Sequence, residues 1–323
     1  SARLASPPPR NRALILQVAI PAPLRRSFDY LPPGDDSGAA APGMRLRGPF
    51  GARTVTGVVL ACGETPSVKD AELRPAEALL DEAPLLDAAQ LELRRWAASY
   101  YEHPLGEVFF TGLPKALRDG RPLPPNAWRL TQRGRGLADT ALSRAPRQRA
   151  AIELLRASEA VPAAALRAAG ISSAVLRELS DKDLIERCRA AAGMPSAELR
   201  ASGPELTGEQ RTAIEALAID GGFACQLLEG VTGSGKTEVY LQQIARCLAA
   251  GRQALVLVPE IGLTPQTLQR FTARFAAPIA VLHSGLSDGE RLEAWLAARD
   301  GSAGIVIGTR SAVFTPLARP GLV

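Results

Sequence analysis

The sequence predicts a multidomain α/β protein that combines a small β-rich domain, a three-helix module and a doubly wound parallel-sheet lobe. Three observations predict this class. β-type segments separated by turn residues open the chain, short amphipathic helical segments follow a proline-rich link, and apolar strands alternate with helical stretches after residue 205. The chain has 323 residues, of which 46% are hydrophobic, so it is long enough for two or three domains with cores of their own.

The first expected domain spans residues 13–118 and follows a flexible arm at residues 1–12. The arm contains Pro7-Pro8-Pro9 and lacks the apolar segment of a signal peptide. The expected elements are strands at 13–20 and 54–61, turns at 32–34 and 48–51, and an amphipathic helix at 85–101.

A proline-rich linker is expected at residues 119–125, and a helical domain at residues 126–203. The helical patterns lie at 147–157, 162–169 and 172–181, and a short strand is expected at 184–187. This spacing is typical of a winged-helix domain, which places its third helix against a DNA duplex. Three small amphipathic helices are also a common packing unit, so contact between this domain and DNA stays open.

The segment from 204 to 323 alternates apolar strands with helices, which predicts a parallel sheet. Strands are expected at 223–228, 255–258, 279–282 and 305–307, and helices at 236–250, 264–275 and 288–299. Ligands of such sheets bind beyond the carboxyl ends of the strands. The loops there are residues 230–236, 259–265, 283–287 and 308–311, and they contain every conspicuous motif of the segment.

The strongest motif is a complete phosphate loop of the form G-x-x-x-x-G-K-[ST] at residues 230–237. It predicts that the backbone around Gly230, Thr232, Gly233, Ser234 and Gly235 surrounds the phosphates of ATP at a helix N-terminus. Lys236 and Thr237 are the predicted catalytic residues, because the lysine reaches the β and γ phosphates and the threonine hydroxyl holds Mg²⁺. The alternative is a glycine-rich turn with a lysine that binds nothing.

Charge, cysteine content and hydropathy limit the possible functions. The net charge of +5 is uneven: residues 1–56 hold 8 Lys and Arg against 3 Asp and Glu, and residues 126–203 hold 13 against 8. A nucleic-acid partner and a set of solvated arginines explain this equally well. The four cysteines are widely spaced, which predicts reduced, buried thiols and no metal site. No apolar run is long enough for a membrane span.

Several motifs resemble those of the primosomal protein N′ (PriA) family of helicases. In the lobe the resemblance is carried by V-P-E-I-G-L-T-P-Q at 258–266, H-S-G-L-S at 283–287 and G-T-R-S-A at 308–312. In the N-terminal region it is carried by S-F-D-Y at 27–30, P-F-G at 49–51 and W-A-A-S-Y-Y at 96–101. The resemblance covers nearly all of residues 13–323.

The resemblance implies a 3′-end DNA-binding domain, a winged-helix domain and the first RecA-like lobe of a superfamily 2 helicase. Such a protein unwinds DNA 3′ to 5′ with ATP and Mg²⁺, recognises stalled forks and starts primosome assembly. Forked DNA with a 3′-OH leading-strand end, single-stranded DNA, other primosome proteins and single-strand-binding protein are the implied partners. A cytoplasmic monomer without a membrane partner is expected.

The resemblance also assigns residues of the N-terminal domain. Phe28, Asp29, Tyr30 and Gly51 are expected to line the pocket for the terminal 3′ nucleotide, where Asp29 accepts the 3′-OH and an aromatic ring stacks on the base. A terminal phosphate would be repelled by the carboxylate. Arg74 stands where the family usually has a lysine, so the charge is kept while the geometry differs.

In the lobe, Gln210 is expected to read adenine with its amide, and Gly308, Thr309 and Arg310 are expected to contact the backbone of a single strand. The alternative for Arg310 is an internal ion pair. His283 is expected to order its loop rather than to catalyse, and Glu260 to position its loop.

Because the sequence stops at Val323, we expect the lobe to be incomplete at its C-terminus. The acidic Mg²⁺-binding motif, the cysteine-rich zinc insertion and the second lobe with its arginine finger would lie beyond it. The fragment is therefore expected to bind DNA, to bind nucleotide weakly at most, and neither to hydrolyse ATP nor to unwind DNA. Two other function classes are a non-catalytic, structure-specific DNA-binding module with a vestigial nucleotide site, and a small-molecule kinase.

Overall fold

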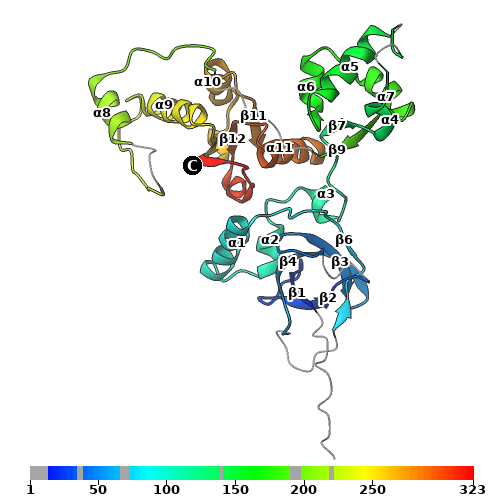
Figure 1. Ribbon diagram of the computed structural model, residues 1–323. Helices are drawn as coiled ribbons and strands as arrows, with labels where there is room; N and C mark the ends of the chain where they lie inside the picture. The colour runs from blue at the N-terminus through cyan, green and yellow to red at the C-terminus, as the bar shows by residue number, and fades with distance from the viewer. Residues whose placement is uncertain are drawn as a thin grey trace, which may run out of the picture. The chain divides into compact units, whose positions relative to one another are not determined.

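The computed structural model describes residues 14–34, 39–65, 73–138, 141–143, 145–189, 198–217 and 222–323 (Figure 1). The chain divides into two compact units. The first comprises residues 1–122, 195–299 and 303–323, and the second comprises residues 123–194 and 300–302. The β-rich part and the parallel-sheet part therefore belong to one unit, and the three-helix part belongs to the other.

The β-rich part of the first unit is built on one six-stranded sheet of order β5-β2-β1-β4-β3-β6. The two predicted strands form as β1 and β4, which pair antiparallel. Alternate side chains of the strands meet in a core around Leu16, Val18, Tyr30, Leu46 and Val59. The strands are β1 (Ile15–Ala19), β2 (Phe28–Leu31), β3 (Arg45–Phe50), β4 (Arg53–Gly63), β5 (Arg74–Pro75) and β6 (Ala78–Leu79).

Helices follow this sheet in the chain. The predicted helix forms as α1, and the Asp87 carboxylate caps it by accepting a hydrogen bond from the Gln90 N–H at 2.8 Å. The next helix lies directly on β1, because a Cβ at Gly106 would be 1.5 Å from the Ile20 carbonyl oxygen. Only glycine permits that approach. The helices are α1 (Ala88–Tyr100), α2 (Leu105–Phe110) and α3 (Lys115–Arg118).

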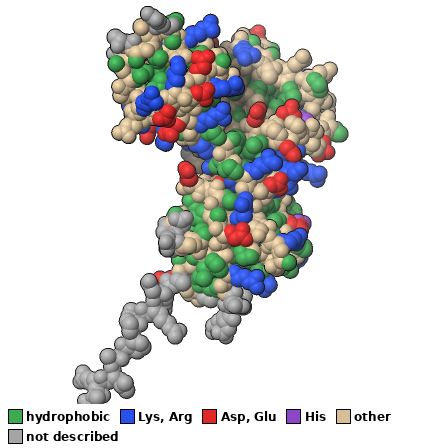
Figure 2. All heavy atoms as spheres, turned by 90° about the vertical axis from the view of Figure 1, so that its right-hand side faces the viewer, with side chains coloured by type: hydrophobic (Ala, Val, Ile, Leu, Met, Phe, Trp, Pro, Cys, Tyr) green, Lys and Arg blue, Asp and Glu red, His purple; other side chains and the backbone are tan. Residues whose placement is uncertain are grey.

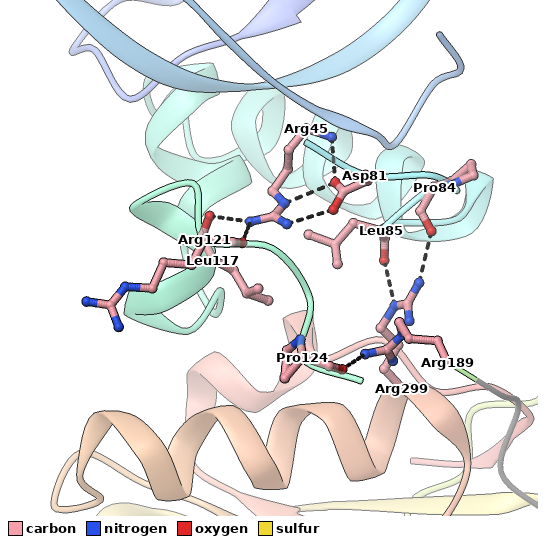
Figure 3. A network of polar contacts seen from close by, with 9 residues as sticks. All are labelled: Arg45, Asp81, Pro84, Leu85, Leu117, Arg121, Pro124, Arg189 and Arg299. Atoms are coloured by element: carbon pink, nitrogen blue, oxygen red, sulfur yellow. Dashed lines mark hydrogen bonds and ion pairs between the residues drawn. The ribbon is translucent and has the colours of Figure 1, made fainter. Parts of the chain in front are cut away.

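A buried ion pair fastens β3 to the segment that follows the sheet (Figure 3). The side chains of Arg45 and Asp81 are 0% and 1% exposed, and Arg45 Nη2 lies 2.6 Å from Asp81 Oδ1. The Nη1 atom of Arg45 donates to the carbonyl oxygens of Leu117 at 2.7 Å and Arg121 at 3.0 Å. One guanidinium thus joins β3 to two segments that are far away in the sequence.

The second unit packs helices against a three-stranded antiparallel sheet of order β8-β7-β9. Its core includes Trp128, Ile152, Leu166, Leu176 and Ile185. The three predicted helices and the predicted strand at 184–187 are formed. The elements are β7 (Ala127–Leu130), α4 (Gln132–Arg135), α5 (Pro146–Arg156), β8 (Val161–Pro162), α6 (Ala163–Ala168), α7 (Ser173–Asp181) and β9 (Ile185–Cys188).

The parallel-sheet part has the strand order β11-β12-β10-β13, and the pairing is parallel throughout. Ala254 of β10 packs in a core with residues of α9 and α10, while its neighbour Leu255 packs in another core with residues of α11. Because successive strand residues face opposite sides, helices cover both faces, as predicted for a doubly wound sheet. The strands are β10 (Gln253–Leu257), β11 (Ile279–Leu282), β12 (Ile305–Gly308) and β13 (Pro320–Leu322). The helices are α8 (Gly208–Ala216), α9 (Lys236–Ala249), α10 (Pro265–Arg274) and α11 (Asp288–Asp300), with the short 3₁₀ helices η1 (Glu260–Gly262) and η2 (Arg310–Phe314).

One predicted strand is absent from this sheet. Residues 223–228 form no strand, and the side chains of Phe223, Leu227 and Val231 are 99%, 84% and 78% exposed. A strand needs a hydrogen-bonded neighbour, and none of the described strands pairs with this segment. The apolar run alone therefore led to a wrong prediction of a buried strand.

The four cysteines are free, but they are not uniformly buried. Cys225 is exposed, Cys62 and Cys188 are half-buried, and Cys247 is buried. The expectation of buried thiols is therefore wrong for Cys225, which lies in the unpaired segment. Burial raises the pKa of the Cys247 thiol to about 11.

The surface charge is mixed. On the face shown in Figure 2, Lys and Arg side chains occur in small groups that are interleaved with Asp and Glu. This interleaving keeps solvated arginines as an explanation for part of the basic excess of the sequence. None of the helices in the described part of the chain has the length and apolar character to cross a membrane.

Candidate nucleotide and DNA-binding sites

The phosphate-loop motif forms a turn that leads directly into α9. Gly233 and Gly235 have φ angles of 87° and 82°, in the left-handed region that favours glycine. A Cβ at Gly235 would lie only 2.2 Å from Gln210 Nε2, and a Cβ at Gly230 would lie 2.8 Å from Ser234 Oγ. Added side chains would therefore fill the turn, and the glycines leave space beside the first N–H groups of a helix, which is where an anion binds.

Lys236 is the first residue of α9, and its side chain folds back across the loop. Its Nζ atom donates to the Val231 carbonyl oxygen at 3.0 Å and also to the Gly230 carbonyl oxygen. Phosphate oxygens are stronger acceptors than these carbonyls, because they carry charge. The half-buried Thr237 follows on the helix. The exposed members of the motif are Gly230, Val231, Thr232, Gly233 and Ser234.

Gln210 lies beside the phosphate loop in the first turn of α8. Its Oε1 atom accepts a hydrogen bond from the Thr207 N–H at 2.9 Å, and Thr207 Oγ1 accepts one from the Gln210 N–H at 3.3 Å. This reciprocal pair is a capping box. The Nε2 atom donates to the Gly235 carbonyl oxygen at 3.4 Å. The amide thus joins the start of α8 to the phosphate loop, and its contact with adenine stays a prediction.

The loops after the parallel strands border an open groove of about 280 Å³, to which Glu260, His283 and Thr309 contribute. Gly308 ends β12 under close packing, because a Cβ there would lie 2.8 Å from the Leu282 carbonyl oxygen. The Thr309 N–H donates to the same oxygen at 3.1 Å. The two residues therefore hold the start of η2 against the end of β11.

Two side chains of this edge bear on the alternatives that the sequence left open. Arg310 is exposed, and it makes no ion pair with any residue that the structure describes. His283 Nδ1 accepts a hydrogen bond from the Gly285 N–H at 3.1 Å, and Arg291 Nη2 donates to the His283 carbonyl oxygen at 2.8 Å. These contacts support the loop-ordering interpretation of His283.

In the β-rich part, β2 and β3 meet although they are not neighbours in the sheet. The Tyr30 hydroxyl donates to the Pro49 carbonyl oxygen at 2.9 Å. The rings of Phe28 and Phe50 meet edge to face, with their centroids 5.2 Å apart. Tyr30 is 4% exposed, so its ring is a core group that holds the two strands together. The predicted stacking on a base is therefore not open to Tyr30, whereas Phe28 is only half-buried.

The other predicted residues of this pocket lie around the same strand. Asp29 is half-buried on β2, and Arg74 is exposed on β5, which pairs with β2 so that Arg74 stands opposite Tyr30. Gly51 is exposed in the turn between β3 and β4, with a φ of 61°. A carboxylate and an aromatic ring thus lie on β2 and a cation lies on its neighbour β5, and the glycine turn follows Phe50, whose ring contacts Phe28.

Two neighbours of this region were missed by the sequence analysis. The Arg26 guanidinium lies 5.1 Å from the centroid of the Phe28 ring, a cation–π distance. Phe50 supports the same ring from its edge. The sequence contained a signal for both, because a basic residue stands two positions before Phe28 and Phe50 lies inside the P-F-G motif.

Comparisons with known proteins find matches for two parts of the chain. The model of the 3′DNA-binding domain (3′BD) of PriA matches residues 17–114. The DEAD/DEAH box helicase model matches residues 207–321. The chain is 40% identical to the replication restart protein PriA of Haemophilus influenzae over 318 residues, which is 96% of this chain and 43% of the relative. It is 32% identical to the protein of that name from Bacillus subtilis over 372 residues, which is 92% of this chain and 46% of the relative.

The two matched models place the chain in the class of proteins that combine a 3′DNA-binding domain with a DEAD/DEAH box helicase domain. A 120-residue stretch is 55% identical to the replication restart protein PriA of Synechocystis sp.. The chain belongs to the PriA family of replication restart proteins, and it corresponds to their N-terminal portion. It spans less than half the length of these relatives.

Proposed function

We propose that this chain recognises the 3′ end of the leading strand at branched DNA and binds ATP as part of a replication-restart helicase. The observation that carries the proposal is the grouping of Phe28, Asp29, Gly51 and Arg74 around β2, in the segment matched by the 3′DNA-binding domain. Forked DNA, other primosome proteins and single-strand-binding protein are the partners that membership of the family suggests for the longer protein.

The chemistry of the β2 region suits a terminal nucleotide. The Asp29 carboxylate accepts a hydrogen bond from a free 3′-OH, and the half-buried Phe28 ring offers a surface on which a base stacks. Arg26 and Arg74 add positive charge for the preceding phosphates. A 3′-phosphate would instead bring like charges together at this carboxylate.

The phosphate loop suits ATP with Mg²⁺. Backbone N–H groups at the start of α9 and the Lys236 ammonium bind phosphate oxygens, and the Thr237 hydroxyl is a ligand for the cation. In a helicase, unwinding is driven by hydrolysis of ATP, in which water takes the γ-phosphoryl group and ADP leaves. Gln210 is placed beside the loop, where its amide Nε2 keeps only a long contact to Gly235.

The G-T-R-S-A loop suits the backbone of a single strand. Gly308 and Thr309 are buried and fix the start of η2, so the contact with a phosphate falls to Arg310, which is exposed next to them. In the second unit we propose a winged-helix role, in which α7 lies against a duplex. Arg177 on α7 and Arg187 on β9 are exposed and support this placement.

End recognition is tested by comparing two forks with the same duplex sequences. One has a free 3′-OH on the leading strand at the branch, and in the other a short loop joins that end to the lagging-strand template. We expect tighter binding of the open fork at matched salt, because only it offers a terminus to Asp29. Equal affinity for the two forks would contradict end recognition and leave only charge-driven DNA binding.

A further inference from the structure

Inside the first compact unit, the helices of the β-rich part contact the segment that contains the G-T-R-S-A loop. This is the loop that we propose binds DNA. Phe314, at the end of η2, packs against a cluster of Ala97 and Ala98 on α1 and Val108 on α2. The approach is close, because a Cβ at Gly112 would lie 3.0 Å from Phe314 Cβ and 3.2 Å from the Ser311 carbonyl oxygen. Helix α1 thus contacts the turn that begins with Arg310.

Arg94 of α1 makes the polar part of this contact. Its side chain is completely buried, and its Nη2 atom donates to the Phe314 carbonyl oxygen at 2.5 Å. Its guanidinium carbon lies 5.3 Å from the centroid of the Phe314 ring. The Nη1 atom donates to the Gln90 carbonyl oxygen at 3.2 Å, and also to the Gln90 side chain. Arg94 therefore contacts both the backbone and the ring of Phe314.

Arg94 is not one half of a simple structural ion pair. Burial lowers the pKa of Arg94 to about 10, and the charge of Asp87 opposes that shift. Its Nε atom has no hydrogen-bond partner in the part of the chain that the structure describes. An apolar side chain of similar length would fill this space without the cost of burying a charge. What an arginine adds at this position is its hydrogen bond to the Phe314 carbonyl oxygen and its cation–π contact with the Phe314 ring.

A second arginine joins the same two parts of the unit (Figure 3). Arg299 of α11 donates from Nε to the Leu85 carbonyl oxygen at 3.2 Å and from Nη2 to the Pro84 carbonyl oxygen at 3.0 Å. Each part thus offers an arginine to backbone carbonyls of the other. Carbonyl contacts of this kind fix position without requiring a particular partner side chain.

We propose that Arg94 is a positioning residue for strand binding: it fixes η2 at Phe314 so that Arg310, at the other end of η2, is held in place for a DNA phosphate. This inference rests on the proposed role of Gly308, Thr309 and Arg310. It adds that binding of a single strand depends on Arg94, a side chain from the β-rich part of the chain.

The test is a double-mutant cycle on the 323-residue chain with Arg94→Met and Arg310→Ala. The probe is a fluorescein-labelled circular single strand, which has no 3′ end and so reports strand contact alone. Arg310→Ala is expected to weaken binding about tenfold and to reduce the steepness of the salt dependence by about 0.7 in the log–log slope. Arg94→Met is expected to weaken binding severalfold with part of the same slope change.

In the Arg310→Ala background, Arg94→Met is expected to have no further effect, because it acts through Arg310. Arg95→Met is the matched control, since Arg95 is the next residue on α1 and donates to the Leu60 carbonyl oxygen at 2.8 Å. It is expected to leave binding unchanged. If Arg94→Met does not fold, Phe314→Leu replaces it, because it removes the ring and keeps an apolar side chain.

The outcomes separate the two proposals. Equal losses from Arg94→Met in both backgrounds, or no loss in the parent, would overturn the positioning role while leaving the role of Arg310 intact. No loss from Arg310→Ala itself would overturn the proposed strand contact and the positioning role together.

Discussion

Replacing Asp81 by alanine leaves the fully buried guanidinium of Arg45 without its counter-charge. The Asp81 carboxylate accepts hydrogen bonds from the Arg45 N–H at 2.8 Å, from Nε at 3.0 Å and from Nη2 at 2.6 Å. Removal of one partner of a buried pair costs about 3–5 kcal/mol. For a unit of this size, 1 kcal/mol corresponds to about 2–4 °C in Tm, so we expect a loss of about 10 °C.

The assay is thermal unfolding followed by circular dichroism, with two matched variants. The double variant Arg45→Met/Asp81→Leu removes both charges and keeps the volume, so it is expected to recover most of the lost Tm. Glu102→Ala breaks the exposed 3.1 Å pair with Arg25 and is expected to change Tm by no more than about 1 °C. A Tm for Asp81→Ala within 2 °C of the parent, on the order of the exposed control, would refute the reasoning.

Two further predictions concern the lobe. At pH 8 a maleimide reagent should label the exposed Cys225 quickly and Cys247 last, because Cys247 is buried and its pKa is raised to about 11; labelling of Cys247 should accelerate as the pH rises. Protection of Cys225 in the folded chain would show that its segment forms the buried strand after all. Lys236→Ala should abolish binding of a fluorescent ATP analogue with Mg²⁺ while it leaves Tm unchanged, and undiminished binding would exclude the phosphate loop as the nucleotide site.

The elements that the sequence predicted well are those whose pattern is local. The strands and helices of the parallel sheet have continuous apolar runs or helical spacing. Ser172 and Thr264, the first residues of the predicted helices at 172–181 and 264–275, are the N-caps of α7 and α10. The segment at 223–228 has the same apolar character, but it lacks a described strand to pair with. Periodicity reports what a segment can bury, and pairing depends on partners elsewhere in the chain.

The candidate site shows the same limit. The resemblance implied that Tyr30 lines the pocket, yet Tyr30 is 4% exposed, and its hydroxyl donates to the Pro49 carbonyl oxygen of β3. The pair of Arg45 and Asp81 and the contact of Arg94 with Phe314 join residues 36 and 220 positions apart, so no local pattern could indicate them. For Gln210, a Thr three positions earlier already signalled a capping box, and that local role is formed.

The most direct test of end recognition measures binding of the chain to a fork whose leading strand ends in 3′-OH and to the same fork ending in 3′-phosphate, at matched salt. The account predicts a clear preference for the hydroxyl end and its loss in Asp29→Ala, because the preference arises from that carboxylate. Equal binding of both ends by the parent chain, or a preference that survives Asp29→Ala, would contradict the assignment of the β2 region as a 3′-end pocket.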